Sequence, residues 1–458
     1  MAQVFSRGLD VSWTRPLTRF PLINWLDPFW HCKSVGMNTQ IPHFKTLFAS
    51  SVFVLALQGC APSSNLNGAA SIDGQTANSQ TGALFTNLSS GQEVADQQAL
   101  AEPDLYLRNR YVEVDRSVLA GIIAKSSQAI GQTVHLNLFE DVGIDFMVEK
   151  FEELGPENFV LSGRIKGDAE SSVTLVQNGD VLVGNVQRGD ADDSYEIRVV
   201  EDKVLAIRSL NPAVESHCEA TDGTEGRQVA DEEVSDDLSA EEMAPIPMSN
   251  PTIDVLVVYT PNAKSRMGGK AGMEALIQMG VADTNRAFSD SGVGATVRLA
   301  GIMEVSKNES SFHSDLSRLK GRNDGKWDEV HRERARLGAD QVSLVGSYGG
   351  NRSGTAGTGF VRSNADTAFT VTRASAFSQY TFSHELGHNI GLNHSDGFVN
   401  RRGRFRTIMA YGGLPRVRRY SNPSLSYNGH PTGNRSHNEA GILNRNVERM
   451  SGFGNSLN

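Results

Sequence analysis

One short stretch constrains the fold and chemistry of this chain more than any other. Residues 381–394 read Thr-Phe-Ser-His-Glu-Leu-Gly-His-Asn-Ile-Gly-Leu-Asn-His. His384 and His388 stand four residues apart, and on an α-helix that spacing places both imidazoles on one face, one turn apart. Gly391 predicts the end of this helix, because glycine takes a left-handed backbone conformation at low cost. The turn would return His394 as a third nitrogen ligand. Three imidazoles with one open position are typical of a catalytic zinc site.

Glu385, beside the first histidine, distinguishes a catalytic zinc site from a structural one. A carboxylate at this position can take a proton from water whose pKa the metal lowers towards about 7, and can later pass it to a leaving amine. A structural zinc site needs no such residue. The alternative, that these histidines are unrelated polar residues on a helix, is disfavoured because the chain has only 11 His among 458 residues.

Together these residues form the pattern His-Glu-x-x-His-x-x-Gly-x-x-His, and at this point the sequence resembles the metzincin zinc endopeptidases. The second mark of that family is a tight turn with a methionine under the zinc, and residues 407–411 read Thr-Ile-Met-Ala-Tyr. The resemblance implies that Met409, 15 residues after His394, is the methionine of this turn. It also implies that Tyr411 reaches the metal or the reacting oxyanion, as a tyrosine does in some metzincins.

The run Asp-Val-Leu-Val-Val-Tyr-Thr-Pro at 254–261 and Ser-Asn-Pro at 421–423 are similar to the reprolysin-like branch, which includes bacterial peptidyl-Asp metalloendopeptidases. The resemblance covers roughly residues 252–450 and implies an α+β fold. We expect a metzincin-like catalytic domain over 251–458, with a twisted mixed sheet plus helices, a zinc helix and a Met-turn. Hydrophobic patterning independently predicts strands at 253–261, 296–305 and 341–345, and helices at 272–289, 314–320 and 328–337.

The N-terminal part of the chain has the features of a signal peptide for secretion. Residues 1–36 have no clear periodicity, and we interpret them as an upstream misreading or an extension. Residues 37–60 have a lysine, an apolar run and Leu-Gln-Gly-Cys, which resembles a lipoprotein signal with lipidation at Cys60. This interpretation is favoured over a simple secretory signal. It predicts a bacterial cell-envelope lipoprotein held to the membrane by its lipid, or a form secreted after processing.

The next segments differ in composition. Residues 61–103 are rich in Ser, Asn, Gln, Gly and Ala, which predicts a flexible tether. Residues 104–218 alternate apolar and polar side chains between turn signals, which predicts a small β-rich prodomain. Residues 219–250 form an acidic linker. Residues 251–458 contain 26 Lys and Arg against 17 Asp and Glu, whereas the rest contains 17 against 36, so the two halves should attract each other.

Cys218 is the last of three cysteines and precedes the linker. Three cysteines cannot form a disulfide scaffold, so packing must stabilise the catalytic part. Some metzincin precursors use a cysteine thiolate to occupy the open zinc position, and Cys218 lies upstream of the catalytic domain as such a zymogen switch must. The alternative, an unpaired and inert cysteine, stays open because Glu-Ser-His-Cys-Glu does not match the best-known switch motif.

Several arginines flank the predicted Met-turn, among them Arg404, Arg406, Arg416 and Arg418. Two interpretations stay open: a solvated basic surface, or a substrate pocket in which one or two guanidiniums select Asp or Glu side chains by bidentate pairing. Nucleic-acid binding is disfavoured, because no aromatic interleaving or known fold supports it.

We therefore predict a zinc endopeptidase made as a latent precursor. One Zn²⁺ ion would be its cofactor, proteins or peptides its substrates, and its own prodomain its inhibitor. The alternatives are a non-catalytic zinc-binding envelope lipoprotein, which Glu385 argues against, and a zinc amidase, which the Met-turn argues against.

Overall fold

The computed structural model describes residues 82–89, 94–123, 129–190, 192–201, 203–215, 217–218, 221–222, 250–349 and 354–457. The predicted extension at 1–36, the signal at 37–60 with Cys60, and most of the acidic linker lie outside the described residues. Within the described part, no helix is long and apolar enough to span a bilayer.

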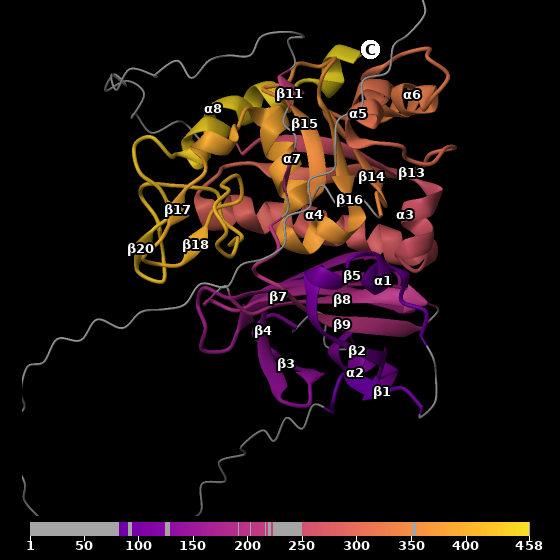
Figure 1. Ribbon diagram of the computed structural model, residues 1–458, viewed down its shortest axis with the longest axis vertical. Coiled ribbons are helices and arrows are strands. Elements are labelled where there is room, and N and C mark those ends of the chain that lie inside the picture. Colours follow the sequence, from indigo (N-terminus) through magenta and orange to yellow (C-terminus); the bar gives the residue numbers. More distant parts are fainter. Residues whose placement is uncertain are drawn as a thin grey trace, which may run out of the picture. The chain divides into compact units, whose positions relative to one another are not determined.

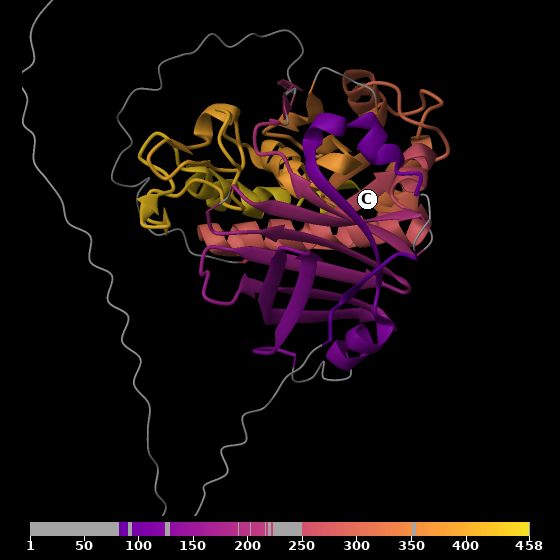
Figure 2. The same ribbon diagram turned by 60° about the horizontal axis from the view of Figure 1, so that its bottom comes forward.

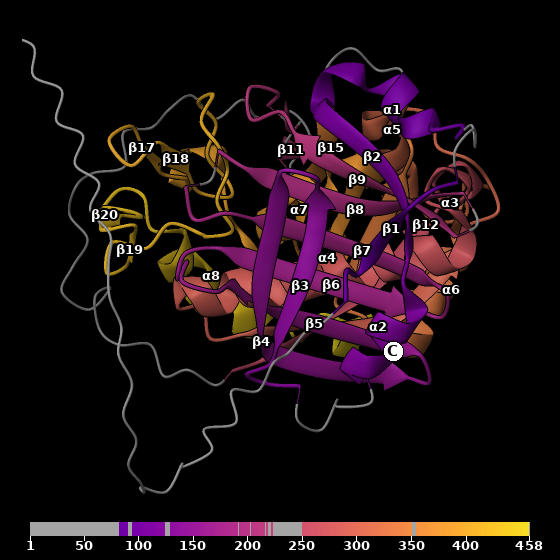
Figure 3. The same cartoon turned by 90° about the horizontal axis from the view of Figure 1, so that it is seen from below.

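A nine-stranded antiparallel sheet occupies the region in which alternation predicts strands. Its order is β1-β2-β9-β8-β7-β6-β5-β4-β3. Figure 3 shows β3 and β4 lying across other strands of the same sheet. The Asn137 side chain on β3 accepts a hydrogen bond from the Phe85 amide on β1 and donates one to the Phe85 carbonyl. We call residues 82–210 the β-domain. Its strands are β1 (Phe85–Asn87), β2 (Tyr106–Val114), β3 (Thr133–Phe139), β4 (Val142–Gly155), β5 (Asn158–Ile165), β6 (Ser172–Asn178), β7 (Val181–Gln187), β8 (Ser194–Glu201) and β9 (Val204–Leu210).

The β-domain begins earlier than composition predicts. The stretch expected to be a tether up to residue 103 contains β1 and helix α1 (Gln97–Ala101), followed by the 3₁₀ turn η1 (Pro103–Leu105). Phe85 is buried, and Asp96 caps α1 by accepting the Ala99 amide at 3.0 Å. Asp96 also pairs with buried Arg208 on β9, at 2.7 Å. Few apolar residues are needed to attach this segment, because an existing sheet supplies most of the contacts.

The second sheet carries the C-terminal part of the chain. Its order is β10-β15-β16-β14-β12-β13, and β11 also pairs with β15. β12 to β14 and β16 are mutually parallel, whereas β15 runs antiparallel to β16. The strands are β10 (His217–Cys218), β11 (Thr221–Asp222), β12 (Thr252–Tyr259), β13 (Thr296–Glu304), β14 (Gln341–Gly346), β15 (Thr355–Val361) and β16 (Phe369–Arg373). This mixed sheet agrees with the predicted α+β class.

Helices pack around this sheet and continue beyond it. They are α3 (Pro261–Arg266), α4 (Gly269–Ser291), α5 (Phe312–Lys320), α6 (Asp328–Leu337), α7 (Thr381–Ile390) and α8 (Glu439–Met450), with α2 (Arg116–Ile123) in the β-domain. Long loops containing the short strands β17 (Val399–Asn400), β18 (Phe405–Arg406), β19 (Ser426–Tyr427) and β20 (His430–Pro431) connect α7 to α8. The predicted strands and helices of this part lie within about two or three residues of the observed bounds.

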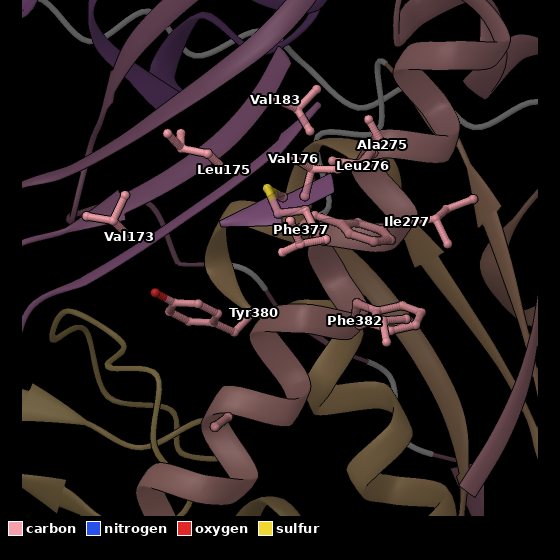
Figure 4. Close-up of a cluster of buried hydrophobic side chains, with 14 of the residues drawn as sticks. Val173, Leu175, Val176, Val183, Ala275, Leu276, Ile277, Phe377, Tyr380 and Phe382 are labelled. Atoms are coloured by element: carbon pink, nitrogen blue, oxygen red, sulfur yellow. The ribbon is translucent and has the colours of Figure 1, made fainter. Parts of the chain in front are cut away.

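Helix α4 lies between the two sheets (Figures 1 and 2). It contacts β6 and β7 of the β-domain as well as β13 and α7. Apolar residues occur around much of its circumference, which is typical of a helix buried on several sides. One continuous apolar core consequently runs from the β-domain through α4 to α7 (Figure 4).

Candidate metal centre and cleft

Helix α7 presents two histidines towards one point. His384 and His388 are both fully buried and lie one turn apart. The helix ends at Gly391, whose φ of 141° disfavours residues with a side chain. A Cβ atom there would also lie 2.8 Å from the Asn446 amide nitrogen. The chain therefore turns at this glycine, and His394 returns to the other two histidines.

The three imidazoles meet through their Nε2 atoms. His388 Nε2 lies 3.1 Å from the Nε2 of both His384 and His394, and the remaining pair is 3.2 Å apart. The other ring nitrogens of the two helical histidines contact backbone carbonyls: His384 Nδ1 is 2.9 Å from Ile408 O, and His388 Nδ1 is 2.7 Å from Leu392 O. Since a carbonyl only accepts, each Nδ1 carries the proton and each Nε2 turns a lone pair to the common point.

This arrangement fits a metal ion. The Nε2 lone pairs of His384 and His388 cannot hydrogen-bond each other, and a cation at the common point would satisfy both of them together with His394. Tetrahedral ligands at 2.0–2.1 Å from zinc would be roughly 3.3–3.4 Å apart, close to the spacing of the Nε2 atoms. Burial also lowers the pKa of the histidines, to about 3 for His388 and about 4 for His394. The imidazoles are thus neutral at ordinary pH, as metal ligands must be.

Glu385 points its carboxylate into the region between α7, β15 and the three histidines, which we call the cleft. It is fully buried, and burial raises its pKa to about 8. Within the described residues, its Oε1 has no hydrogen-bond partner, while the Cys218 thiol lies 3.4 Å from Oε2. Two glycines of β15 make room for it: a Cβ atom at Gly357 would lie 2.2 Å from Oε1, and one at Gly359 3.3 Å from Oε2. A buried acceptor with an unused oxygen is suited to receive a proton.

Met409 and Tyr411 contact different parts of the site. Met409 is fully buried, and a Cβ atom at Gly387, on α7, would lie 3.2 Å from its sulfur. The hydroxyl of Tyr411 lies 3.3 Å from His394 Nε2 and accepts a hydrogen bond from the Cys218 amide at 2.6 Å. Tyr411 is therefore near the common point of the histidines, and Met409 packs beneath the helix that carries two of them.

Cys218 enters the cleft on an added strand. β10 and β11 pair in parallel with β15, with Cys218 opposite Gly357 and Thr221 opposite Phe360. The Cys218 sulfur lies 3.3 Å from His388 Nε2. Its ligand atom and those of the three histidines are all within 4.8 Å of one another. Burial, followed by the charge of nearby Glu385, raises the pKa of the thiol well above its ordinary value.

Two of the four arginines predicted for a pocket lie beside this strand. Arg406 and Arg416 are both buried. Arg406 is 3.6 Å from the carboxylate of Glu215, whose two oxygens also accept the amides of Gly412, at 3.0 Å, and Gly413, at 3.3 Å. Burial and then the charge of Arg416 lower the pKa of Arg406 to about 9. Within the described residues, Glu215 is the only carboxylate within 4.0 Å of either guanidinium.

The other two arginines lie elsewhere. The Arg404 side chain is 70 % exposed and is 3.6 Å from Asp192. Arg418 is buried against α4, where it lies 3.4 Å from Asp283 and 3.3 Å from Asp290. The structure therefore does not bring Arg404 or Arg418 to the cleft, because one faces solvent and the other is held by two carboxylates of α4.

Sequence reasoning missed three residues that support the site. Glu215 gives a weak signal, as an acidic residue three positions before a candidate switch cysteine. Glu439, on α8, accepts the Met409 amide at 3.1 Å. Gln187, on β7, donates to the Arg416 carbonyl at 2.7 Å. Neither of the last two has a local sequence signal, because their partners are distant in the chain.

Comparison with known proteins shows which family the sequence matches. The model of the metallo-peptidase family M12B, reprolysin-like, matches residues 249–438. The chain is 31% identical over 293 residues to a peptidyl-Asp metalloendopeptidase of Stenotrophomonas maltophilia strain K279a, covering 59% of this chain and 67% of the relative. It is 32% identical over 304 residues to the peptidyl-Asp metalloendopeptidase of strain R551-3, covering 58% of this chain and 66% of that relative. It is also 32% identical over 315 residues to the peptidyl-Asp metalloendopeptidase of Xanthomonas campestris pv. campestris, covering 62% of this chain and 70% of that relative.

Proposed function

The chain belongs to the reprolysin-like metallopeptidases of family M12B and is a metalloendopeptidase, and we propose that it binds one Zn²⁺ ion through His384, His388 and His394. The observation that carries this proposal is the convergence of the three Nε2 atoms at 3.1–3.2 Å. A zinc ion bound there would act as a Lewis acid that makes water more acidic and polarises a peptide carbonyl.

Glu385 is the general base of this reaction. Its carboxylate takes one proton from the attacking water as the new carbon–oxygen bond forms. It then gives that proton to the amide nitrogen as the carbon–nitrogen bond breaks, so that a carboxylic acid and an amine leave. Tyr411, whose hydroxyl lies 3.3 Å from His394 Nε2, donates to the oxygen that becomes negative in the tetrahedral intermediate.

Cleavage of denatured casein tests this function on the chain after its linker has been cut. We expect hydrolysis that a zinc chelator abolishes and that zinc restores, and no hydrolysis by Glu385→Gln. One bound zinc per chain without hydrolysis of casein or of mixed peptides would instead favour the non-catalytic zinc-binding alternative. The peptidase relatives give that alternative no support.

We further propose that the uncut chain is latent and that its prodomain is the inhibitor. The strands β10 and β11 lie along β15 as an added strand, which is a common mode of peptide binding. The Cys218 sulfur, 3.3 Å from His388 Nε2, is placed to provide a fourth ligand as thiolate. This supports the switch interpretation over that of an inert cysteine.

We also propose a preference for acidic side chains in the substrate. The Glu215 carboxylate is held by two amides and the Arg406 guanidinium, three residues from the cysteine at the histidines. Two buried guanidiniums without a carboxylate would be unfavourable, so a substrate Asp or Glu would replace Glu215 once the added strand leaves. The names of the relatives, peptidyl-Asp metalloendopeptidases, support the same preference.

Finally, we propose that the precursor is a cell-envelope lipoprotein anchored through Cys60, or is secreted after processing. The motif at 57–60 supports this location. Expression in a bacterial host with a labelled fatty acid tests it. Label in the unmodified chain but not in Cys60→Ala is expected, and an unlabelled chain would contradict the anchor.

A further inference from the structure

Arg373 is a buried arginine at the end of β16, and it contacts two distant parts of the chain. Its guanidinium donates to the backbone carbonyl of Thr355, the first residue of β15. It also forms an ion pair with Glu102, in which Nη1 lies 2.8 Å from Oε1. Within the described residues, Glu102 is the only carboxylate within 4.0 Å of this guanidinium. One acidic residue of the β-domain therefore neutralises the charge of Arg373 in the uncut chain.

The register of the sheet places Arg373 close to the cleft. β15 lies between β16 and β10, with Gly357 opposite Thr372 on one side and opposite Cys218 on the other. Arg373 follows Thr372 directly, so only β15 separates it from the added strand. A peptide bound along β15 would lie about 10 Å from β16, a distance that an arginine and a carboxylate side chain can span together.

Arg373 and Arg406 lie on the same side of the cysteine that enters the cleft. Thr355, which accepts from Arg373, is opposite His217, whereas Arg406 is 3.6 Å from Glu215. His217 and Glu215 both precede the cysteine in the added segment. A peptide that replaced this segment would therefore pass the two arginines on one side of the bond that is cut, at different residues.

The two arginines are neutralised in the same way. Both belong to the part of the chain after the linker, and their carboxylates come from the part before it: Glu215 for Arg406 and Glu102 for Arg373. The second pair is incomplete, because Oε2 of Glu102 and Nε of Arg373 are buried without a hydrogen-bond partner among the described residues. A carboxylate that used both of its oxygens would bind this guanidinium more strongly than Glu102 does.

We propose that Arg373 is a second specificity-determining residue, which binds an acidic side chain of the substrate once the β-domain has left. Glu102 takes the place of that side chain in the uncut chain. The acidic residue that Arg373 binds is distinct from the one proposed for Arg406, so the enzyme favours substrates with two acidic residues on one side of the scissile bond. This inference rests on the proposed function, because it concerns the substrate of the same cleft.

The alternative is that Arg373 only supports the backbone of β15 through the Thr355 carbonyl. Arg373→Gln separates the two roles, because its amide can still donate to this carbonyl but carries no charge. Arg373→Leu removes both the donor and the charge. A purely structural role predicts that the Gln variant behaves like the parent, whereas the specificity role predicts that it behaves like the Leu variant.

Peptide binding to the inactive Glu385→Gln chain, cut in its linker and loaded with zinc, tests the inference without hydrolysis. Each peptide is capped at both ends, has one fixed Asp and is otherwise uncharged. A second Asp, or Asn as its neutral counterpart, is placed at each of the three positions on either side, and fluorescence anisotropy gives Kd. At one position we expect Asp to bind about fivefold to tenfold more tightly than Asn, an effect between that of an exposed ion pair and that of a buried charged hydrogen bond.

This gain should disappear in both Arg373→Gln and Arg373→Leu. It should persist in Arg336→Leu, which removes an exposed arginine of α6, and in Arg406→Leu, which weakens binding of the fixed Asp instead. Equal Kd for Asp and Asn at every position, or a gain that survives Arg373→Gln, would overturn the inference. A chain whose parent form binds these peptides as expected but hydrolyses nothing would contradict the proposed function alone.

Discussion

The sulfur of Cys218 lies 3.3 Å from Nε2 of His388, although 169 residues separate them in the chain. The thiol is held there by the pairing of β10 with β15 and by the Cys218 amide, which donates to the Tyr411 hydroxyl. In the proposed zinc site, the cysteine would occupy the position that substrate and water need.

Replacing this cysteine should weaken latency. We expect uncut Cys218→Ala to hydrolyse peptides about tenfold faster than the uncut parent, which corresponds to the loss of about 1.4 kcal/mol of inhibition. Activity would remain below that of the cut enzyme, because the strand pairing persists. Initial rates on a quenched peptide measure the effect. Arg404→Ala, at an exposed position away from the histidines, is the control and should leave the rate unchanged. Equal rates for the parent and Cys218→Ala would favour the inert-cysteine alternative.

Substitutions within α7 should separate catalysis from metal binding. Glu385→Gln is expected to lower kcat by roughly 10²–10⁴-fold, the range for loss of a general base, while bound zinc stays near one per chain. His388→Ala should instead lose the metal, because it removes one of three converging ligands. Zinc content and kcat, measured on the same preparations, check this. Loss of zinc from Glu385→Gln would show that its role is not confined to proton transfer.

The acidic preference should depend on Arg406. For the cut enzyme, Arg406→Leu is expected to lower kcat/KM for an Asp-containing peptide by about 10- to 100-fold, the effect of losing roughly 1.5–3 kcal/mol from a charged hydrogen bond. The matching Asn-containing peptide should be affected much less, so the ratio of the two controls for a general loss of structure. Arg404→Leu, which removes an exposed guanidinium, should leave the ratio unchanged. An unchanged ratio in Arg406→Leu would contradict the assignment.

Glu439 should make a contribution to stability that falls as pH rises towards neutrality. This residue is fully buried, and burial raises its pKa from 4.5 to about 7. Between these values the folded chain keeps a proton that the unfolded chain has released, so the free energy of unfolding decreases with pH, by at most about 3 kcal/mol. The stabilisation is complete below pH 4.5 and is lost as pH passes about 7.

Thermal unfolding between pH 5 and 8 measures this dependence. Glu439→Gln should unfold at a lower temperature at pH 5, because its NH2 group, which only donates, would face either the Met409 or the Ser421 amide in place of an accepting oxygen. Between pH 5 and 8 its midpoint should then fall less, or rise more, than that of the parent. Glu448→Gln, at an exposed position on the same helix, should retain the parental slope. An unaltered slope in Glu439→Gln would show that other groups cause the dependence.

The N-terminal extension of the β-domain should contribute to stability. Asp96→Ala leaves buried Arg208 without its closest carboxylate, and breaking such a pair costs about 3–5 kcal/mol. Denaturant unfolding should reveal this loss, whereas Asp104→Ala, at an exposed position, should change little. Equal stability of Asp96→Ala and the parent would agree better with the tether expected from composition.

What the sequence determined by itself is mostly local. The four-residue spacing of His384 and His388 and the glycine at 391 specify a helix with two proposed metal ligands and a turn, because neighbouring residues set both features. The buried strands and the amphipathic helices after residue 251 are also local patterns. The family resemblance followed from two such motifs, and the structure places both beside the same three imidazoles.

Only the tertiary structure decided which distant residues meet. The sequence presents four arginines of similar chemistry, but the positions of Asp283 on α4 and Glu215 before β10 decide that Arg418 is structural and that Arg406 lies at the cleft. Likewise, composition could not show that residues 85–101 join a sheet, or that Gln187 reaches α7. The contacts of Gln187, Asp96 and Arg418 join segments more than 80 residues apart, and their energies depend on burial, which no local pattern contains.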